Sequence, residues 1–185
     1  MFAYLFFLYF CILTNLCHFC MNKVQNTLVS LTKSALFGTA LNLPEPLTAS
    51  EYEELYHCAK HNGVMALCLD GIQRLPESQQ PDKVLKMKWI ANVGAIEKRY
   101  ADKQKALDML MDILRPDDIA CMVFKGFSIS RLYPVPSHRE FGDLDIFLYK
   151  DYSRGNTAFR KNGIHVNTEN HHHAQCRING ILVQL

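Results

Sequence analysis

Two aspartates one residue apart, Asp143 and Asp145, have the types and spacing that most directly indicate chemistry. They lie in the run GDLDIFLY, which has the composition of a β-strand. In a strand, residues i and i+2 point to the same side, with Cα atoms about 6.6–7 Å apart. Carboxylates this close repel each other unless a cation lies between them, usually Mg²⁺ or Mn²⁺. The pair therefore predicts a metal site for phosphoryl or nucleotidyl transfer, although Asp-x-Asp is also common in turns and on solvated strand faces.

A candidate phosphate-binding turn lies upstream, in the stretch FKGFS. Gly126 follows a short apolar run and begins a helical turn, so the backbone there can approach a phosphate closely. The amides of Phe127 and Ser128 would then point at the phosphate oxygens. Positive charge that can meet a polyphosphate is supplied by Lys125, Arg131 and Arg139.

The elements before these motifs are predicted to be helical, over residues 21–115. One helix has Thr48 or Ser50 as its N-cap, glutamates in its first turn and an Asn-Gly pair at its end. A short helix and then a long one follow. From residue 82 to residue 114, apolar side chains recur at three- and four-residue steps, interrupted at Gly94. This pattern predicts one long amphipathic helix, or two helices with a kink.

After residue 115 the pattern changes to strands, and residues 116–185 are predicted to form a small α/β core. The run IACMVF is suited to a buried strand, and LDIFLY to a second one. A helix ending at Asn162-Gly163 follows. Asn179-Gly180 stands between two alternating runs, which is a strong hairpin signal. The predicted fold class is α+β, with N-terminal helices followed by a small mixed β-sheet.

The composition names no particular macromolecular partner. Lys plus Arg number 20 and Asp plus Glu number 18, so the charge balance gives no strong signal for nucleic acid. The seven cysteines are scattered and form no tetrahedral metal pattern, which favours reduced thiols in the cytoplasm.

Residues 1–20 contain no charged side chain and approach the length of a membrane span. They lack the positively charged start and the small-residue cleavage site of a secretory signal. The favoured interpretation is an over-extended gene start, with translation beginning at Met21. The alternative is a membrane anchor, which would make the protein membrane-anchored rather than cytoplasmic.

The segment from residue 124 to residue 148 resembles the core motif of the uncharacterised nucleotidyltransferase family, a branch of the polymerase-beta-like nucleotidyltransferase superfamily. The matching residues, in the family's order, are Lys125, Gly126, Tyr133, Pro134, Arg139, Gly142, Asp143 and Asp145. The resemblance implies that Asp143 and Asp145 are catalytic and hold Mg²⁺ or Mn²⁺. It implies a nucleoside triphosphate site at Lys125, Gly126, Ser128, Arg139 and Gly142. The implied reaction moves a nucleoside monophosphate from the triphosphate to an unknown acceptor.

The resemblance continues into the last strand, ILVQL, where the family usually reads Val-Glu-Leu-His. That glutamate is expected to be a third catalytic carboxylate, and Gln184 takes its place here. An amide accepts no proton and is a weak metal ligand. The chain also stops one residue later, so a core truncated at its C-terminus is expected. Two interpretations stay open: a nucleotidyltransferase impaired by Gln184, and a catalytically dead nucleotide-binding or interaction module.

The histidines give weaker signals. His57 and His61 have metal-ligand spacing on a helix, but no third ligand accompanies them, so surface histidines are the favoured interpretation. Three consecutive histidines, residues 171–173, would alternate faces in a strand, so at most two of them can converge, and a place for one or two in the active cleft is the less favoured interpretation.

Overall fold

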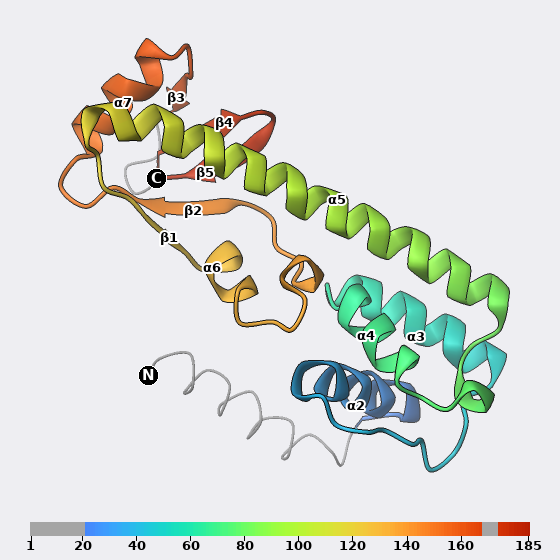
Figure 1. Cartoon of the computed structure of the whole chain (residues 1–185). Helices are drawn as coiled ribbons and strands as arrows, with labels where there is room; N and C mark the ends of the chain where they lie inside the picture. The colour runs from blue at the N-terminus through green and yellow to red at the C-terminus, as the bar shows by residue number, and fades with distance from the viewer. Residues whose placement is uncertain (1–20, 168–173) are drawn as a thin grey trace. The chain divides into compact units, whose positions relative to one another are not determined.

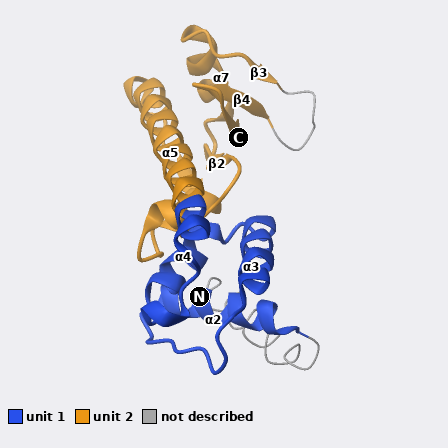
Figure 2. Cartoon of the chain, turned by 90° about the vertical axis from the view of Figure 1, so that its right-hand side faces the viewer, with its two compact units in different colours: residues 1–89 blue, residues 90–185 orange. Residues whose placement is uncertain are grey.

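The structure is a computed structural model that describes residues 21–167 and 174–185 (Figure 1). Residues 1–20 and the histidines at 171–173, for which the sequence suggests roles, lie outside the described residues. The chain divides into two compact units between Trp89 and Ile90 (Figure 2). Among the described helices, none combines the length and the apolar composition that a membrane crossing needs.

The described part of the first unit is helical. Its complete elements are α2 (Lys23–Phe37), α3 (Ala49–His61), α4 (Met65–Gln73) and the 3-10 turn η1 (Glu77–Gln79). Helix α2 packs against both α3 and α4. Each of the three helices contributes a fully buried apolar side chain: Leu31, Leu55 and Ile72. The apolar faces of these amphipathic helices therefore pack together and form a hydrophobic core.

Side chains specify where these helices begin. Asn22 caps α2 in a reciprocal capping box. Thr48 caps α3 in the same way, and its amide donates to Oε2 of Glu51 at 2.7 Å. This hydrogen bond is the main cause that lowers the pKa of Glu51. Of the two N-caps predicted for this helix, the structure uses Thr48 rather than Ser50.

Gly71 allows α4 to approach α2 closely. A Cβ built on Gly71 would lie 2.4 Å from the carbonyl oxygen of Leu31 in α2, closer than any side chain atom can come. Trp89, the single tryptophan of the chain, is fully buried in the same unit. Its Nε1 donates to the carbonyl oxygen of Met65 at 2.9 Å. Its fluorescence should therefore report on the packing of the first unit.

The long helix α5 (Lys83–Leu114) begins in the first unit and continues into the second. Asp82 caps it by accepting from the amides of Val84 and Leu85 at 2.8 and 2.9 Å. Its 32 residues are about 48 Å long at the usual rise per residue. The helix is continuous through Gly94 (Figure 1), so of the two alternatives, one long helix or two with a kink, the structure has the single helix.

The second unit adds a five-stranded mixed sheet of order β1-β2-β5-β4-β3. Strands β2 and β5 are parallel, and the other neighbouring pairs are antiparallel. The elements after α5 are η2 (Arg115–Asp117), β1 (Met122–Phe124), α6 (Gly126–Ser130), η3 (Pro136–His138), β2 (Leu144–Phe147), α7 (Tyr152–Lys161), β3 (Val166–Asn167), β4 (Gln175–Ile178) and β5 (Ile181–Gln184). Helices followed by a mixed sheet confirm the predicted α+β class.

One face of this sheet packs into the core of the second unit. Leu144, Val183 and Cys176 form a row across β2, β5 and β4, and each is at most 3% exposed. They pack in one cluster with Leu110 of α5 and Phe159 of α7. Residues one position along each strand point to the opposite face. The side chain of Asp145 therefore lies on the face turned away from this core.

Two local predictions have different outcomes. The Asn179-Gly180 hairpin between β4 and β5 is confirmed, with φ values of 49° and 79°. The buried strand predicted over residues 119–124 is wrong in extent and burial, because β1 has three residues and lies at the sheet edge. Met122 is 44% exposed there, whereas Ile119 reaches the core before the strand begins.

The contact between α2 and α4 gives a stability prediction. Gly71→Ala forces a methyl group against the Leu31 carbonyl, so we expect it to lower the free energy of unfolding by about 1–3 kcal/mol. The measurement is urea denaturation followed by Trp89 fluorescence. The matched control is Gly94→Ala in α5, where a Cβ meets nothing within 4 Å. We expect that change to stabilise the protein by about 0.5–1 kcal/mol, seen by circular dichroism. A Gly71→Ala protein as stable as the wild type would contradict the packing account.

Candidate functional site

The two aspartates lie at the start of β2. Asp145 is inside the strand and 5% exposed, whereas Asp143 lies on the bend before it and is half-buried. Leu144, between them, is fully buried in the core. Both carboxylates raise the pKa of Lys125, Asp145 chiefly through a hydrogen bond and Asp143 through its charge. The structure thus brings together three of the residues that the sequence predicts for the site.

Lys125 and Asp145 form an ion pair in which Nζ lies 2.7 Å from Oδ1. The lysine side chain is 62% exposed, but the carboxylate is only 6% exposed. A carboxylate with so little contact with water needs a compensating charge, and the ammonium group supplies it. Nζ also lies 5.2 Å from the ring centre of Phe124. Within the described residues, the cation paired with Asp145 is therefore Lys125.

The backbone of Lys125 has a conformation that L-residues rarely adopt, with φ 52° and ψ −120°. Such a residue costs on the order of 1–3 kcal/mol and persists only where its surroundings fix it. It connects β1 to α6, and the turn directs its side chain to Asp145. The ion pair is one of the contacts that hold this turn.

Packing explains why residue 126 is a glycine, and the sequence alone does not reveal this. A Cβ at this position would lie 2.8–2.9 Å from three side-chain carbons of Phe141. The hydroxyl of Ser128 donates to the carbonyl oxygen of Val123 and so closes the turn. The Ser128 hydroxyl is therefore already used. The groups available for the predicted phosphate contact are the backbone amides in the first turn of α6, which have no acceptor within the helix.

Gln184 lies directly beside Asp145 on the neighbouring parallel strand, β5. Gln175 of β4 pairs in turn with Gln184, so the three side chains form one row on the same face of the sheet. The side-chain amides of Gln175 and Gln184 make no hydrogen bond to another described residue. The position that the resemblance assigns to a third carboxylate is thus next to Asp145, and it carries an uncharged group here.

The other predicted residues lie around this centre without ion pairs to the aspartates among the described residues. The Nη1 atom of Arg139 donates to the carbonyl oxygen of Glu140 at 3.3 Å, and its guanidinium lies 5.9 Å from the Phe141 ring centre. Gly142 is exposed, and a side chain there would meet nothing within 4 Å, so packing does not require the glycine. Arg131 is exposed at the end of α6.

One residue near the site is absent from the sequence-based prediction. Lys103 of α5 is only 7% exposed, and burial is the main cause that lowers its pKa. Its Nζ donates to the carbonyl oxygen of Phe141 and lies 4.1 Å from the ring centre. The signal was present in the pattern, since Lys103 falls between Tyr100 and Leu107 in the apolar stripe of the helix. A charged residue in such a stripe indicates a buried partner.

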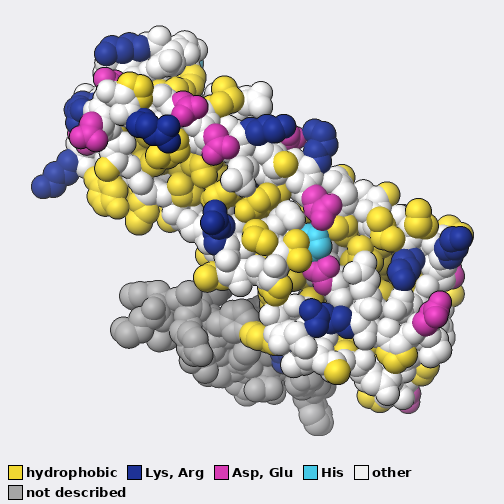
Figure 3. Space-filling model, in the orientation of Figure 1, with side chains coloured by type: hydrophobic (Ala, Val, Ile, Leu, Met, Phe, Trp, Pro, Cys, Tyr) yellow, Lys and Arg dark blue, Asp and Glu magenta, His cyan; other side chains and the backbone are white. Residues whose placement is uncertain are grey.

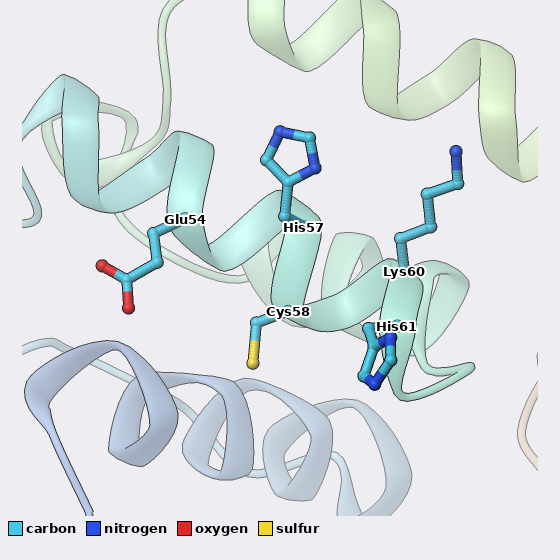
Figure 4. A pocket seen from close by; sticks show the side chains of 5 residues that line it. All are labelled: Glu54, His57, Cys58, Lys60 and His61. Carbon is cyan, nitrogen blue, oxygen red and sulfur yellow. The ribbon is translucent and has the colours of Figure 1, made fainter.

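The histidines of α3, His57 and His61, are both exposed. His57 and His61 border a shallow, open depression together with Glu54, Cys58 and Lys60. Figure 4 shows the two imidazoles on different sides of α3, with Cys58 directed toward α2. Within residues 21–167 and 174–185, no cluster of three His, Cys, Asp or Glu side chains could hold a metal ion. The favoured interpretation of these residues as surface histidines agrees with this arrangement.

The donors around Asp145 fit Mg²⁺ held together with a substrate, but not a site formed by protein alone. Two carboxylates, Asp143 and Asp145, and the amide oxygen of Gln184 are hard oxygen ligands. Mg²⁺ typically takes one or two carboxylates and completes its six ligands with water and substrate phosphates. With two carboxylates and an amide oxygen, the remaining ligands of such a site would come from water and substrate phosphates.

Comparison with protein families identifies a match. A family model described as uncharacterised nucleotidyltransferase matches residues 48–183. The match spans most of the chain and includes the helices from α3 onward and the five strands up to residue 183, so Gln184, the last residue of β5, lies just beyond it. No curated protein matches, and no solved structure matches.

The ion pair gives a prediction about protonation. Asp145→Asn removes the main cause that raises the pKa of Lys125, so we expect that pKa to fall toward the ordinary lysine value. Asp143→Asn should lower it less, because Asp143 acts only through its charge. NMR titration of the lysine side-chain nitrogens measures both. An unchanged pKa in Asp145→Asn would contradict the pair.

The same shift has a consequence for stability. A raised folded-state pKa means that the pair stabilises the fold fully below pH 10.5, the ordinary lysine pKa. The stabilisation is lost as the pH rises through the higher pKa of the folded state. We therefore expect the difference in stability between wild type and Asp145→Asn to shrink above pH 10.5, measured by urea denaturation. A difference that grows at alkaline pH would have the wrong sign.

Proposed function

The chain belongs to the uncharacterised nucleotidyltransferase family, and on this premise we propose that its second unit binds a nucleoside triphosphate with Mg²⁺ at Asp143 and Asp145. The reaction is attack of an acceptor oxygen on the α-phosphorus. The bond from that phosphorus to the oxygen bridging to the β-phosphate breaks, and pyrophosphate leaves. The acceptor's identity is not specified by the residues described.

The observation that carries the proposal is the buried carboxylate of Asp145 with Lys125 as its ion-pair partner and Asp143 nearby. When bound, Mg²⁺ would neutralise charge on the phosphates and on the leaving pyrophosphate. Asp143 and Asp145 would hold it. The ammonium of Lys125, on a flexible and mostly exposed side chain, would then be free to move from Asp145 to a phosphate oxygen.

The other residues have supporting roles in the proposal. The amides that follow Gly126, including that of Ser128, would donate to phosphate oxygens at the start of α6. Arg139 would stabilise the negative charge that develops during transfer. The open space around Gly142 leaves room for a ligand beside Asp143.

Gln184 determines how fast such a transfer can be. Gln184 pairs with Asp145 across β2 and β5, and in the proposal it takes the place of the carboxylate that would accept the acceptor's proton, which an amide cannot do. The proton is then left to water, so slow turnover is expected. The same observation favours a second function, binding of the triphosphate without turnover, in which the unit acts as a nucleotide-binding module.

The face of the described residues that Figure 3 shows gives no strong signal for a nucleic-acid partner. On the face in Figure 3, basic and acidic side chains are interspersed over the described part of the chain. A nucleic-acid site would need a continuous basic stripe. The proposed partners are therefore a nucleoside triphosphate and an acceptor of unknown chemistry.

The binding step has a direct test. We expect Asp143→Ala to weaken binding of Mg²⁺–triphosphate by about tenfold or more, because it removes one of two carboxylate ligands. Calorimetric titration with each of the four ribonucleoside triphosphates measures the affinity. Asp108→Ala, an exposed carboxylate on α5, is the control and should bind as the wild type does. Equal affinities in all three proteins would remove the proposed site.

Turnover is tested by restoring the carboxylate. Gln184→Glu should raise Mg²⁺-dependent pyrophosphate release by about 100-fold or more, the usual contribution of a general base. Gln175→Glu places the same charge one strand further from Asp145 and should not increase the rate. If Gln184→Glu binds the triphosphate and releases no more pyrophosphate than the wild type, the module without catalysis is the correct function.

A further inference from the structure

Lys103 is a buried basic residue beside the hydrophobic core of the second unit. It is 7% exposed, and its neighbours on the same side of α5, Ala106 and Leu110, are fully buried. An ammonium group so placed destabilises a fold unless specific partners compensate for its lost hydration. The contacts of Lys103 should therefore show why the helix has a lysine there.

Those contacts converge on Phe141. Nζ of Lys103 donates to the carbonyl oxygen of Phe141 and lies over its ring, 4.1 Å from the centre. The ring packs edge-on against Tyr100 of α5 and Phe127 of α6, with centroid distances of 6.1 and 6.2 Å. It also fills the space that a side chain on Gly126 would take. Phe141 thus joins α5 to the turn that begins α6.

Charged groups of both signs face Lys103. Arg99, on the same helix, and Arg139 lower its pKa, whereas Asp143 and Glu140 raise it, all by less than burial lowers it. These groups, except Asp143, line a cavity of about 30 Å³ together with apolar neighbours. Of the four charged groups that act on Lys103, three belong to the segment 139–143, namely Arg139, Glu140 and Asp143. The segment carries both Arg139 and Asp143 of the proposed site.

We propose that Lys103 is a positioning residue that, through Phe141, fixes segment 139–143 against the Gly126 turn and thereby sets the place of Asp143. It is not a catalytic residue, because its ammonium is used on the Phe141 carbonyl and makes no ion pair with Asp143 among the described residues. Its effect on the nucleotide site rests on the function proposed above, but its effect on the segment does not.

The chemistry of the contact explains why an apolar residue would not serve. A methionine fills nearly the same volume, but it leaves the Phe141 carbonyl without a donor and the ring without a cation. The segment 139–143 contains no helix or strand residue, so few backbone hydrogen bonds hold it. Removing one charge-assisted hydrogen bond should therefore loosen this segment more than it loosens the sheet.

The test compares Lys103→Met, Lys103→Arg and the exposed-site control Lys105→Met. Hydrogen exchange of residues 139–145 is followed by mass spectrometry, with α3 as an internal reference. We expect Lys103→Met to speed exchange in this segment by about tenfold or more. Lys103→Arg should restore slow exchange, and Lys105→Met should match the wild type. Unchanged exchange in Lys103→Met would overturn the proposal.

Calorimetry with Mg²⁺–triphosphate on the same proteins adds a functional readout. If the wild type binds, Lys103→Met should bind about tenfold more weakly or worse, and Lys103→Arg should recover most of the affinity. If the wild type binds nothing, the proposed function fails while the exchange result still decides the role of Lys103.

A second variant covers the case in which Lys103→Met does not fold. Phe141→Leu keeps the backbone carbonyl and most of the apolar bulk but removes the ring beneath the ammonium. We expect it to fold and to speed exchange of residues 139–145 several-fold. Wild-type exchange in Phe141→Leu would overturn the proposal independently of Lys103→Met.

Discussion

A carboxylate that is buried in a strand has to be neutralised, and Asp145 imposes this requirement on the second unit. Lys125 meets it from a turn whose backbone is strained, with an ammonium 2.7 Å from the carboxylate. The sequence spacing predicts a divalent metal ion at this place, which stays a prediction, and the structure shows the Lys125 ammonium paired with Asp145. In the function proposed above, this long and mostly exposed side chain moves from Asp145 to a phosphate oxygen when a metal ion and a triphosphate bind.

The features of the fold that are determined by residues near one another in sequence were predictable. Capping residues such as Thr48 begin helices by accepting hydrogen bonds from nearby amides, and Asn179-Gly180 supplies the two positive φ values of a tight hairpin. The strand alternation around Asp145 also follows from the sequence, because Leu144 and its apolar neighbours must face the core. These features depend on neighbours in sequence, and a single chain reveals them.

The parts that depend on distant contacts were not predictable. The structure explains Gly126 by packing, because a side chain there would collide with the ring of Phe141, fifteen positions later in the sequence. The burial of Lys103 becomes interpretable only when the same phenylalanine lies against it. The edge position of β1 follows from the strand order, which no local pattern contains. Each case involves residues that the fold brings together across several elements, so the sequence shows unusual residues without showing their partners.

The most direct measurement is a crystal structure of the chain with Mn²⁺ and a non-hydrolysable triphosphate analogue, using the anomalous signal of manganese to locate the ion. The account predicts a peak at Asp143 and Asp145, phosphates at the start of α6, and the Lys125 ammonium moved from Asp145 to a phosphate oxygen. A structure in which Lys125 still contacts Asp145 while manganese and phosphates bind elsewhere, or do not bind, would contradict it.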